Sequence, residues 1–411
     1  MSDSHLYTRL LLSKGHGYPL FHPQPFDDLP TTSREVGTQV GDVGIITPDG
    51  AFDVIFNICR PADDPANRFG VPTGFEQIEL VPEDMASRPR YHRPGSDISN
   101  TKISKRRVDV DAGVDGNVFL PVTAGAVIEI TASSQEAAVL FLPDGASRTD
   151  VRPLQQLRDY ALEHARRWYE FVNGPLQRMV DSNDLYLVTG VDKCTSWSVA
   201  AIENHSQDGQ ISLRLKAAPV GGGRASYAWE WETSSSFADS GPRRGPGEDE
   251  FASNQTVFLR GFKVAIRPPS KPFQKKTTAA SIVESDPSEL LSRSGFIPFS
   301  RSPTASSSIF SRRSAPAGGE SLSGGNDRAS DGSVEYFPPR PRTYHPASAI
   351  NARLLDLFPE HDVAVTHDDE WGSILNEVSS AFNDLPAILM RLKEDQKRAL
   401  VTIPHSTSGQ F

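Results

Sequence analysis

The chain has 411 residues, 37% of them hydrophobic and 23% charged, with a formal net charge of −10 at pH 7. This composition indicates a soluble protein with a substantial core and argues against binding nucleic acid along the whole chain, because phosphate contacts need a surplus of Lys and Arg. Two cysteines, Cys59 and Cys194, are too few for a disulfide framework or a four-thiolate zinc site, so we expect free thiols in a reducing compartment.

The N-terminal residues show no export signal. An acidic residue precedes the apolar run Leu10–Leu12, which is shorter than the apolar core of a signal peptide. No stretch approaches the roughly 18 apolar residues of a transmembrane helix. We therefore expect a cytoplasmic protein without a transmembrane segment.

Short strands are the first predicted elements. Residues 43–46 and 51–58 flank Thr47-Pro48-Asp49-Gly50, whose proline presets φ and whose glycine permits a positive φ, which predicts a hairpin. Residues 137–142 form a continuously apolar run, so we expect this strand to be buried on both faces. The strands predicted after the hairpin are Phe75–Val81, Ile103–Val110, Gly125–Thr131 and Ala137–Leu142.

A long amphipathic helix is predicted at Val151–Val172. Thr149 or Asp150 is expected to cap its start, Pro153 fits its first turn, and Asn173-Gly174-Pro175 is a stop signal. Its apolar residues recur at steps of three and four, which predicts a helix docked on the core. They are Leu154, Leu157, Ala161, Ala165, Trp168 and Val172.

An antiparallel meander is predicted after this helix. Leu185–Val188 is continuously apolar, as in an interior strand, whereas Gln210–Ala217 alternates as in a half-exposed strand. The other strands of the meander are predicted at 196–202, 226–232 and 257–266.

The composition changes at residue 268. Residues 268–342 are rich in Ser, Pro, Gly and Arg and have no apolar periodicity, so we expect them to be disordered. A helix at 349–358, a strand at 362–366 and a helix from Trp371 to about Leu392 follow, and their apolar stripe predicts docking in cis or on a partner. The predicted class is α+β, with an antiparallel strand-rich main domain at 1–267, a disordered insert at 268–342 and a C-terminal segment at 343–411.

Cys194 is the first candidate for chemistry. Lys193 beside it could lower the pKa of its thiol, and His164 and His205 are the bases nearest in sequence. No nucleophile motif surrounds this cysteine, and a small buried hydrophobe is the favoured interpretation.

His367-Asp368-Asp369-Glu370 is the densest group of potential metal ligands. Carboxylates at the end of a strand could hold a divalent cation. The favoured alternative is a helix start, in which Thr366, Asp368 or Asp369 is the N-cap and the acidic side chains complement the helix dipole.

Two further patterns in the sequence favour structural roles. Gly221-Gly222-Gly223-Arg224 lacks the Lys-Ser/Thr pair of a phosphate-binding loop and is predicted to be a hairpin loop. Tyr227, Trp229 and Trp231 could form a carbohydrate, peptide or membrane surface, but packing against the helix that carries Trp168 is favoured. We thus assign no catalytic, cofactor-binding or metal-binding residue and expect no cofactor.

Several segments together carry a family resemblance. They are "GDVGIITPDGAFDVIFNIC", "ISKRRVDVDAG", "HARRWYEFVNG", "LYLVTGVDKCTSWSVAA", "FLRGFKVAIR" and "VAVTHDDEW". The chain resembles an uncharacterised protein family of mushroom-forming (agaricomycete) fungi over nearly all of its length except the Ser-rich insert. The resemblance implies an intracellular context and transfers no functional residue, because that family has no assigned activity.

Two function classes remain. The favoured one is a non-catalytic intracellular interaction or regulatory protein with an unknown protein partner, since no catalytic motif is present and a long insert separates the C-terminal segment from the main domain. The alternative is a gasdermin-like membrane-acting or pore-forming effector, because Ser196–Lys216 and Ser226–Glu232 alternate as membrane-inserting hairpins do. An enzyme of unknown type has the least support.

Overall fold

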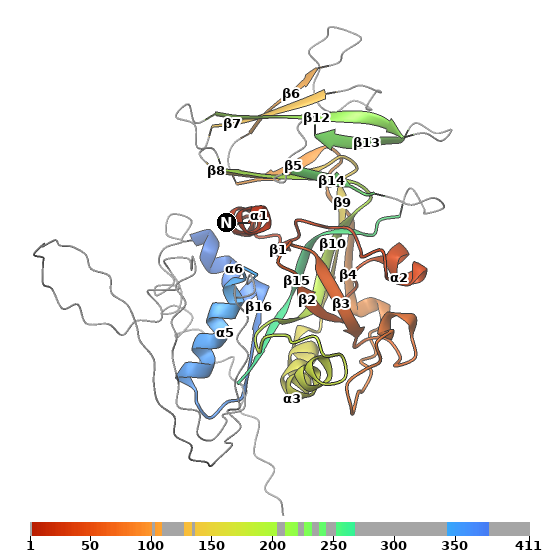
Figure 1. Ribbon diagram of the computed structural model, residues 1–411, viewed down its shortest axis with the longest axis vertical. Coiled ribbons are helices and arrows are strands. Elements are labelled where there is room, and N and C mark those ends of the chain that lie inside the picture. Colours follow the sequence, from red (N-terminus) through yellow and green to blue (C-terminus); the bar gives the residue numbers. More distant parts are fainter. Residues whose placement is uncertain are drawn as a thin grey trace, which may run out of the picture. The chain divides into compact units, whose positions relative to one another are not determined.

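The computed structural model describes the chain from residue 2 to residue 377 with gaps, and it confirms the α+β class (Figure 1). Contacts group the described residues into one compact unit. The insert predicted to be disordered, 268–342, lies outside the described residues, as does the end of the last predicted helix. The described residues are 2–100, 103–108, 127–133, 136–203, 210–220, 226–231, 238–243, 252–267 and 343–377.

Two long antiparallel strands, β10 (Leu185–Cys194) and β15 (Gln255–Ile266), form the centre of the largest sheet. Two strands pair with the edge of β10 that faces away from β15. The first half of β10 pairs with β2 (Asp42–Ile46) and its second half with β9 (Ala146–Val151). Beyond these, β3 (Phe52–Asn57) pairs with β2, which confirms the predicted hairpin. Likewise β4 (Met85–His92) pairs with β9.

The outer edge of β15 is also shared by two strands. The short β1 (Tyr18–Pro19) pairs with its first half, and β16 (Val363–His367) pairs with its second half. The C-terminal segment, here residues 343–377, therefore docks in cis on the main domain, which is one of the two modes that its apolar stripe predicts. Its two helices flank β16 in the chain and are α5 (Pro346–Leu357) and α6 (Asp368–Glu377).

Two four-stranded antiparallel sheets complete the described β-structure. The apolar strand β8 is buried from Ala138 to Leu142, as its continuous apolar pattern predicts. One sheet has the order β14 (Ala238–Gly241), β11 (Trp197–Glu203), β8 (Glu136–Leu142) and β5 (Ser96–Ser99). The other has the order β13 (Ser226–Trp231), β12 (Gln210–Val220), β7 (Val127–Ser133) and β6 (Ile103–Val108).

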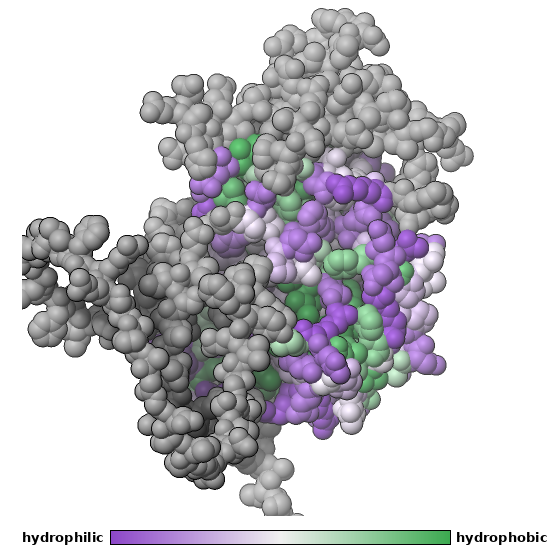
Figure 2. Space-filling view, in the orientation of Figure 1, coloured by the Kyte–Doolittle hydropathy of each residue, from purple (hydrophilic) through white to green (hydrophobic). Residues whose placement is uncertain are grey.

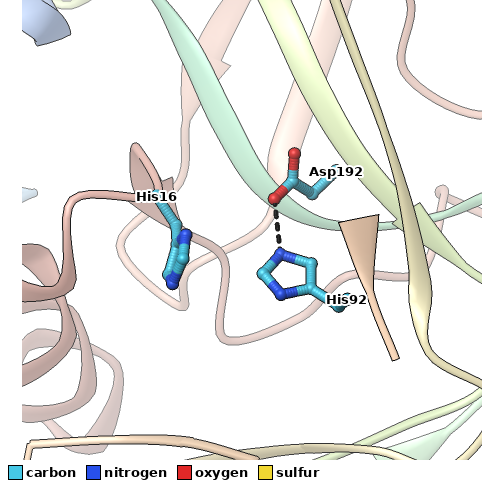
Figure 3. A group of neighbouring side chains, drawn as sticks. All are labelled: His16, His92 and Asp192. Atoms are coloured by element: carbon cyan, nitrogen blue, oxygen red, sulfur yellow. Dashed lines mark hydrogen bonds and ion pairs between the residues drawn. The ribbon is translucent and has the colours of Figure 1, made fainter. Parts of the chain in front are cut away.

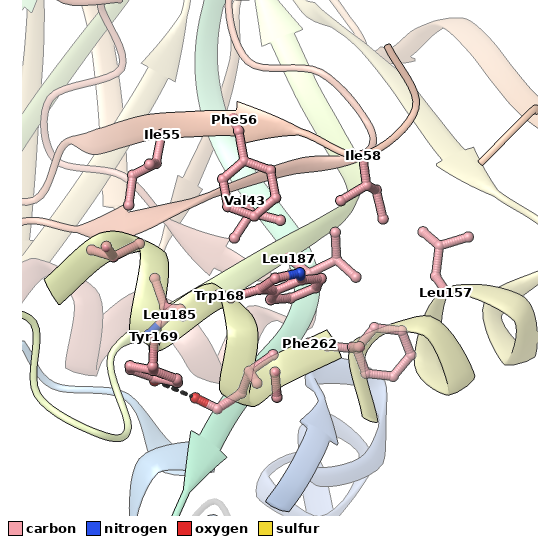
Figure 4. Packing of buried hydrophobic residues seen from close by; sticks show 14 of the residues in the cluster. Val43, Ile55, Phe56, Ile58, Leu157, Trp168, Tyr169, Leu185, Leu187 and Phe262 are labelled. Atoms are coloured by element: carbon pink, nitrogen blue, oxygen red, sulfur yellow. Dashed lines mark hydrogen bonds between the residues drawn. The ribbon is translucent and has the colours of Figure 1, made fainter. Parts of the chain in front are cut away.

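Helix α3 (Leu154–Asn173) packs on one face of the largest sheet (Figure 4). Trp168 is 1% exposed and lies among side chains of β2, β3, β10 and β15, and the Tyr169 hydroxyl donates a hydrogen bond to the Val264 carbonyl at 2.8 Å. The predicted docked helix is thus confirmed. Its predicted start is wrong, because Thr149 and Asp150 belong to strand β9 and Pro153 is the N-cap, without a side-chain cap.

The opposite face of the sheet is covered by both ends of the described chain. Tyr186 and Val188 point away from α3 and pack with Tyr18 of the N-terminal region and with Ile350 and Trp371 of α5 and α6. Burial on both faces explains why β10 is apolar without alternation. The N-terminal region begins with α1 (Asp3–Leu11) and the short 3-10 helix η1 (Leu12–Lys14).

The sequence predictions erred where strands are polar. Phe75–Val81, predicted as a strand, is irregular, although Phe75, Ile78 and Leu80 still pack against the core. Strands β4, β5, β9 and β14 were not predicted, because their residues show no apolar alternation and only pairing makes them strands. Other unpredicted elements are α1, η1, β1, α2 (Thr31–Val36), η2 (Pro65–Asn67) and η3 (Pro82–Asp84).

Candidate functional site

Cys194 is a buried residue of the core. It is 2% exposed at the end of β10, and its Sγ donates to the Gln255 carbonyl at 3.6 Å. Lys193 donates instead to the Val36 carbonyl at 2.7 Å, and burial lowers the pKa of its amine to about 8. His164 lies on α3 against Tyr160, while His205 lies outside the described residues.

His367 is the N-cap of α6, whereas the sequence predicts this role for Thr366, Asp368 or Asp369. Its Nδ1 accepts a hydrogen bond from the Asp369 amide at 3.2 Å, and its own amide donates to Glu370 Oε2 at 2.9 Å. These reciprocal bonds form a capping box in which an imidazole replaces the usual hydroxyl. Since Nδ1 accepts, Nε2 carries the proton of the neutral ring and donates to Thr189 Oγ1 at 2.8 Å.

The three carboxylates that follow His367 diverge. Asp368 is 3% exposed and turns into the core, Asp369 faces solvent with its side chain 70% exposed, and Glu370 pairs with Arg158 of α3. Their oxygens therefore do not converge on one position. The geometry favours the helix-start interpretation over the metal site.

A group of potential metal ligands forms elsewhere, at β10. His16, His92 and Asp192 each place a ligand atom within 4.8 Å of the others, and Figure 3 shows the His16 ring beside His92 and the bond from His92 to Asp192. Asp192 is fully buried, and its carboxylate accepts from His92 Nε2 at 2.8 Å. We call these three residues with Arg148 and Arg260 the Asp192 cluster.

Two guanidinium groups occupy the remaining positions on Asp192. Arg148 binds both carboxylate oxygens at 2.8 Å, and Arg260 binds Oδ1 at 2.9 Å, so each oxygen accepts two hydrogen bonds. Burial alone would raise the pKa of Asp192, but the bonds from His92 and Arg148 and the charge of Arg260 lower it to about 2. A saturated carboxylate beside two cations does not suit a metal ion. The Asp192 cluster instead ties β4, β9, β10, β15 and the His16 loop together.

No protein-family model matches the sequence, and no curated protein matches it significantly. The resemblance to the agaricomycete family therefore stays a prediction. Within the described residues, no helix is long and apolar enough to span a bilayer.

A second buried polar group surrounds Asp368. Its Oδ2 accepts hydrogen bonds from the Tyr186 hydroxyl and from the Gly261 amide, the latter at 3.2 Å. His345, the N-cap of α5, accepts from the Ala347 amide with Nδ1 and stacks on Tyr18 with ring centroids 4.9 Å apart. Burial raises the pKa of Asp368 to about 7, although the bond from Tyr186 opposes this shift.

The Asp368 group, unlike the Asp192 cluster, is not saturated. Asp368 Oδ1, His345 Nε2 and Trp371 Nε1 are buried and have no hydrogen-bond partner among the described residues, and the first two lie 3.4 Å apart. A cavity of about 120 Å³ borders Asp368 and Trp371. Buried polar atoms without hydrogen-bond partners are uncommon in native proteins, which marks this group as a candidate for function. We define Asp368, His345, Trp371 and this cavity as the candidate functional site.

The sequence contains a signal for the Asp192 cluster. Asp192 and Arg260 are charged residues inside the largely apolar strands β10 and β15, each of which also contains one lysine, and charges in such strands indicate a buried ion pair. Nothing local indicates that His16 or His92 meets them, or that His345 meets Asp368. The Gly221–Arg224 loop and the side chains of Tyr227, Trp229 and Trp231 lie outside the described residues.

Proposed function

We propose that this chain is a non-catalytic interaction or regulatory protein. Its C-terminal segment, residues 343–377, covers the outer edge of β15 and prevents other proteins from pairing with it. The observation that carries the proposal is the antiparallel register from Phe262↔His367 to Ile266↔Val363. An unoccupied sheet edge presents unpaired backbone groups that bind an extended segment of another protein. The docked segment blocks this mode of binding, and its release would permit it.

Polar contacts accompany the strand pairing and give the docking its specificity. Asn351 of α5 is fully buried, donates to the Lys263 carbonyl at 2.9 Å and accepts from the Thr366 hydroxyl at 2.6 Å. Arg267, at the end of β15, donates to carbonyls at the end of α5, including those of Phe358 and His361. Each buried hydrogen bond contributes about 1 kcal/mol, so loss of a few of them would release the segment.

The long connection between β15 and α5 makes release reversible. Residues 268–342 separate Arg267 from the first described residue of the C-terminal segment. The entropic cost of closing such a connection rises only logarithmically with its length, so a released segment stays near its docking site. A tethered segment of this kind competes with a partner for the same edge, which is the behaviour expected of a regulator.

A pair of variants tests the proposal on the full chain. Ala265 and Ala364 lie directly opposite each other on β15 and β16, so Ala265→Cys with Ala364→Cys should lock the segment by a disulfide under oxidation. Asn351→Ala should loosen the segment. Mass spectrometry would confirm that the new thiols pair with each other and not with Cys59 or Cys194.

The decisive readout compares partner capture from native extract by the locked and the loosened chains. The loosened chain should capture a protein that the oxidised, locked chain does not, and reduction of the lock should restore capture. Hydrogen exchange at β15 should rise in the loosened chain alone. Equal capture by both chains, with exchange at β15 clearly different, would contradict the proposal.

The gasdermin-like alternative depends on membrane-inserting hairpins and is less well supported. Trp197–Ala201 of β11 is buried at every position, which suits a packed strand better than an alternating one. Hydrophobic side chains gather in small areas between hydrophilic ones on the described part of the face in Figure 2. Dye leakage from liposomes caused by the loosened chain would favour this alternative instead.

A further inference from the structure

Release of the C-terminal segment leaves two hydrogen-bond donors of the main domain without their acceptor. The Tyr186 hydroxyl and the Gly261 amide both donate to Oδ2 of Asp368, the amide at 3.2 Å. Asp368 is the first residue of α6 and leaves with the segment, so both bonds break on release. A partner that binds in place of the segment gains by bringing an acceptor to this position, because a donor that is covered without one is costly.

The electrostatic surroundings of this position favour a negatively charged acceptor. Burial raises the pKa of Asp368 to about 7, but Tyr186, Gly261 and Arg260 of the main domain all oppose this shift and stabilise the carboxylate. The charge of Asp369, which destabilises the carboxylate, belongs to the segment itself. Hydrogen bonds to an ionised acceptor are stronger than those to a neutral one. The main domain therefore offers a binding position for a carboxylate oxygen.

The register of β16 determines where this carboxylate stands relative to the paired strand. His367 is paired with Phe262, so Asp368 comes directly after the last paired residue and reaches the Gly261 amide. A partner strand that pairs with the same edge in the same direction brings its own next residue to the two donors. The position of the acidic residue along the partner is thereby defined.

Alternate side chains of β16 contact different parts of the protein. Val363 and Val365 pack against the core cluster that contains α3. Ala364, between them, packs against Leu355 of α5, the segment's own helix. The main domain thus contacts two apolar side chains at alternate positions, and the second stands three residues before Asp368.

We propose that the partner of the released β15 edge is an extended protein segment with two apolar residues at alternate positions and an aspartate three residues after the second. Its strand pairs antiparallel with Phe262–Ile266, and its aspartate accepts from the Tyr186 hydroxyl and the Gly261 amide. It needs no counterpart of α5. This inference rests on the proposed function, since the edge and both donors become available only when the C-terminal segment is released.

A displayed library of short random peptides tests this chemistry on the full chain. Selection uses the loosened chain, Asn351→Ala. The oxidised chain with Ala265→Cys and Ala364→Cys, whose edge stays covered, removes peptides that bind elsewhere. Enriched peptides should share the pattern apolar-x-apolar-x-x-Asp. Enrichment of peptides without an acidic residue there would overturn the inference and leave the edge-covering role intact, whereas no enrichment over the locked chain would contradict the proposed function itself.

Defined peptides measure the contribution of the carboxylate. The probe is a fluorescent peptide with the sequence of residues 361–371, and its binding to the loosened chain is followed by fluorescence polarisation. Asp368→Ala in the peptide should weaken binding at least about tenfold, and Asp368→Asn should weaken it less, because the amide oxygen accepts without a charge. Asp369→Ala is the matched control at a largely exposed side chain and should leave binding unchanged. Equal binding of the native and Asp368→Asn peptides would overturn the requirement for an acidic residue.

Tyr186→Phe in the loosened chain shows whether the carboxylate meets this hydroxyl. The difference in affinity between the native and Asp368→Ala peptides should shrink about fivefold, because one hydrogen bond is already absent from the variant chain. Tyr160→Phe is the matched control, since the Tyr160 hydroxyl donates to the Glu76 carbonyl, and it should leave the difference unchanged. Circular dichroism and urea midpoints establish that both variants fold. An undiminished difference in folded Tyr186→Phe would refute the site.

Discussion

The hydroxyl of Tyr186 donates a hydrogen bond to Oδ2 of Asp368, 182 positions later in the chain. This bond joins the central strand β10 to the first residue of α6. The same oxygen accepts from the Gly261 amide, which lies on the edge of β15 between the segments that pair with β1 and β16. Asp368 thus closes the gap that two separate strands leave in the sheet edge.

The titration of Asp368 should make stability depend on pH. Burial raises its pKa from 3.8 to about 7, so the folded state binds the proton more tightly than the unfolded state. The free energy of unfolding should therefore fall as the pH rises towards 7 and level off above it. Asp368→Asn should remove this decline. Urea midpoints of both proteins between pH 5.5 and 8 would measure it, as approximate limits of the window.

Tyr186→Phe tests the same pH dependence by shifting the pKa of Asp368 instead of removing its carboxyl group. Because the bond from Tyr186 lowers the pKa of Asp368, its loss should raise that pKa further and extend the decline to higher pH. His16 and His367, whose pKa values burial lowers to about 4, act in the opposite direction below about pH 6.5. The test therefore compares the difference in urea midpoint between each variant and the wild type at every pH. If the midpoints of wild type and Asp368→Asn changed with pH in parallel, the raised pKa of Asp368 would be contradicted.

Loss of the charge of Asp192 should be costly. Asp192→Asn leaves the guanidinium groups of Arg148 and Arg260 without their common counter-ion, and we expect a loss of about 3 to 5 kcal/mol in the free energy of unfolding at neutral pH. Asp150, which is 36% exposed and pairs with Arg260 alone, is the control, and Asp150→Asn should cost clearly less.

The effect of Asp192 should depend on pH in the sense opposite to that of Asp368. Its pKa is lowered to about 2, so its contribution is present above the unfolded value of 3.8 and is lost as the pH falls through 2. The difference between wild type and Asp192→Asn should shrink over that interval. If the difference in urea midpoint between wild type and Asp192→Asn stayed constant with pH, the loss of stability would not arise from the charge of Asp192.

Trp168→Ala should destabilise the main domain by about 3 to 5 kcal/mol, because the side chain is 1% exposed and its loss creates a cavity between α3 and the sheet. Glu170→Ala, at an exposed position of the same helix, should change stability by less than about 0.5 kcal/mol. Chemical denaturation followed by circular dichroism measures both. Similar midpoints for the two variants would be incompatible with a docked α3.

Asn351→Ala should loosen the C-terminal segment without unfolding the main domain. The substitution leaves the Lys263 carbonyl and the Thr366 hydroxyl without their partner, at a cost of about 1 to 3 kcal/mol. Amide exchange should accelerate in β16 and along Phe262–Ile266 of β15. Arg353→Ala, on the exposed side of α5, is the control and should not change exchange there.

Two glycines should respond oppositely to alanine. Gly372→Ala should stabilise the protein by about 0.5 to 1 kcal/mol, because the new Cβ meets open space and alanine favours a helix. Gly261→Ala should destabilise it, since its Cβ would lie 2.1 Å from the Leu187 carbonyl oxygen. Thermal unfolding of both variants measures the two signs. If Gly261→Ala stabilised the protein, the close approach of β10 and β15 at this position would not be tight enough to exclude a Cβ atom.

Local sequence patterns were sufficient where burial repeats with a regular period. The steps of three and four from Leu157 to Val172 specify α3, and the unbroken apolar runs of β8 and of the first half of β10 specify strands covered on both faces. Turn chemistry at Pro48 and Gly50 specified the hairpin of β2 and β3. These patterns depend only on neighbours in the chain, so the sequence alone determined them.

Tertiary pairing decided the polar strands and the polar groups. β4 and β9 lack an apolar period and become strands because they pair with each other and β9 also pairs with β10. The apolar stripe of the C-terminal segment predicted docking, yet only the fold shows why β15 receives it: β1 covers just Leu259 and Phe258 and leaves the rest of that edge open. His345 Nε2 and Asp368 Oδ1 lie 3.4 Å apart for the same reason. Their proximity follows from the docking of a distant segment, and no spacing in the sequence encodes it.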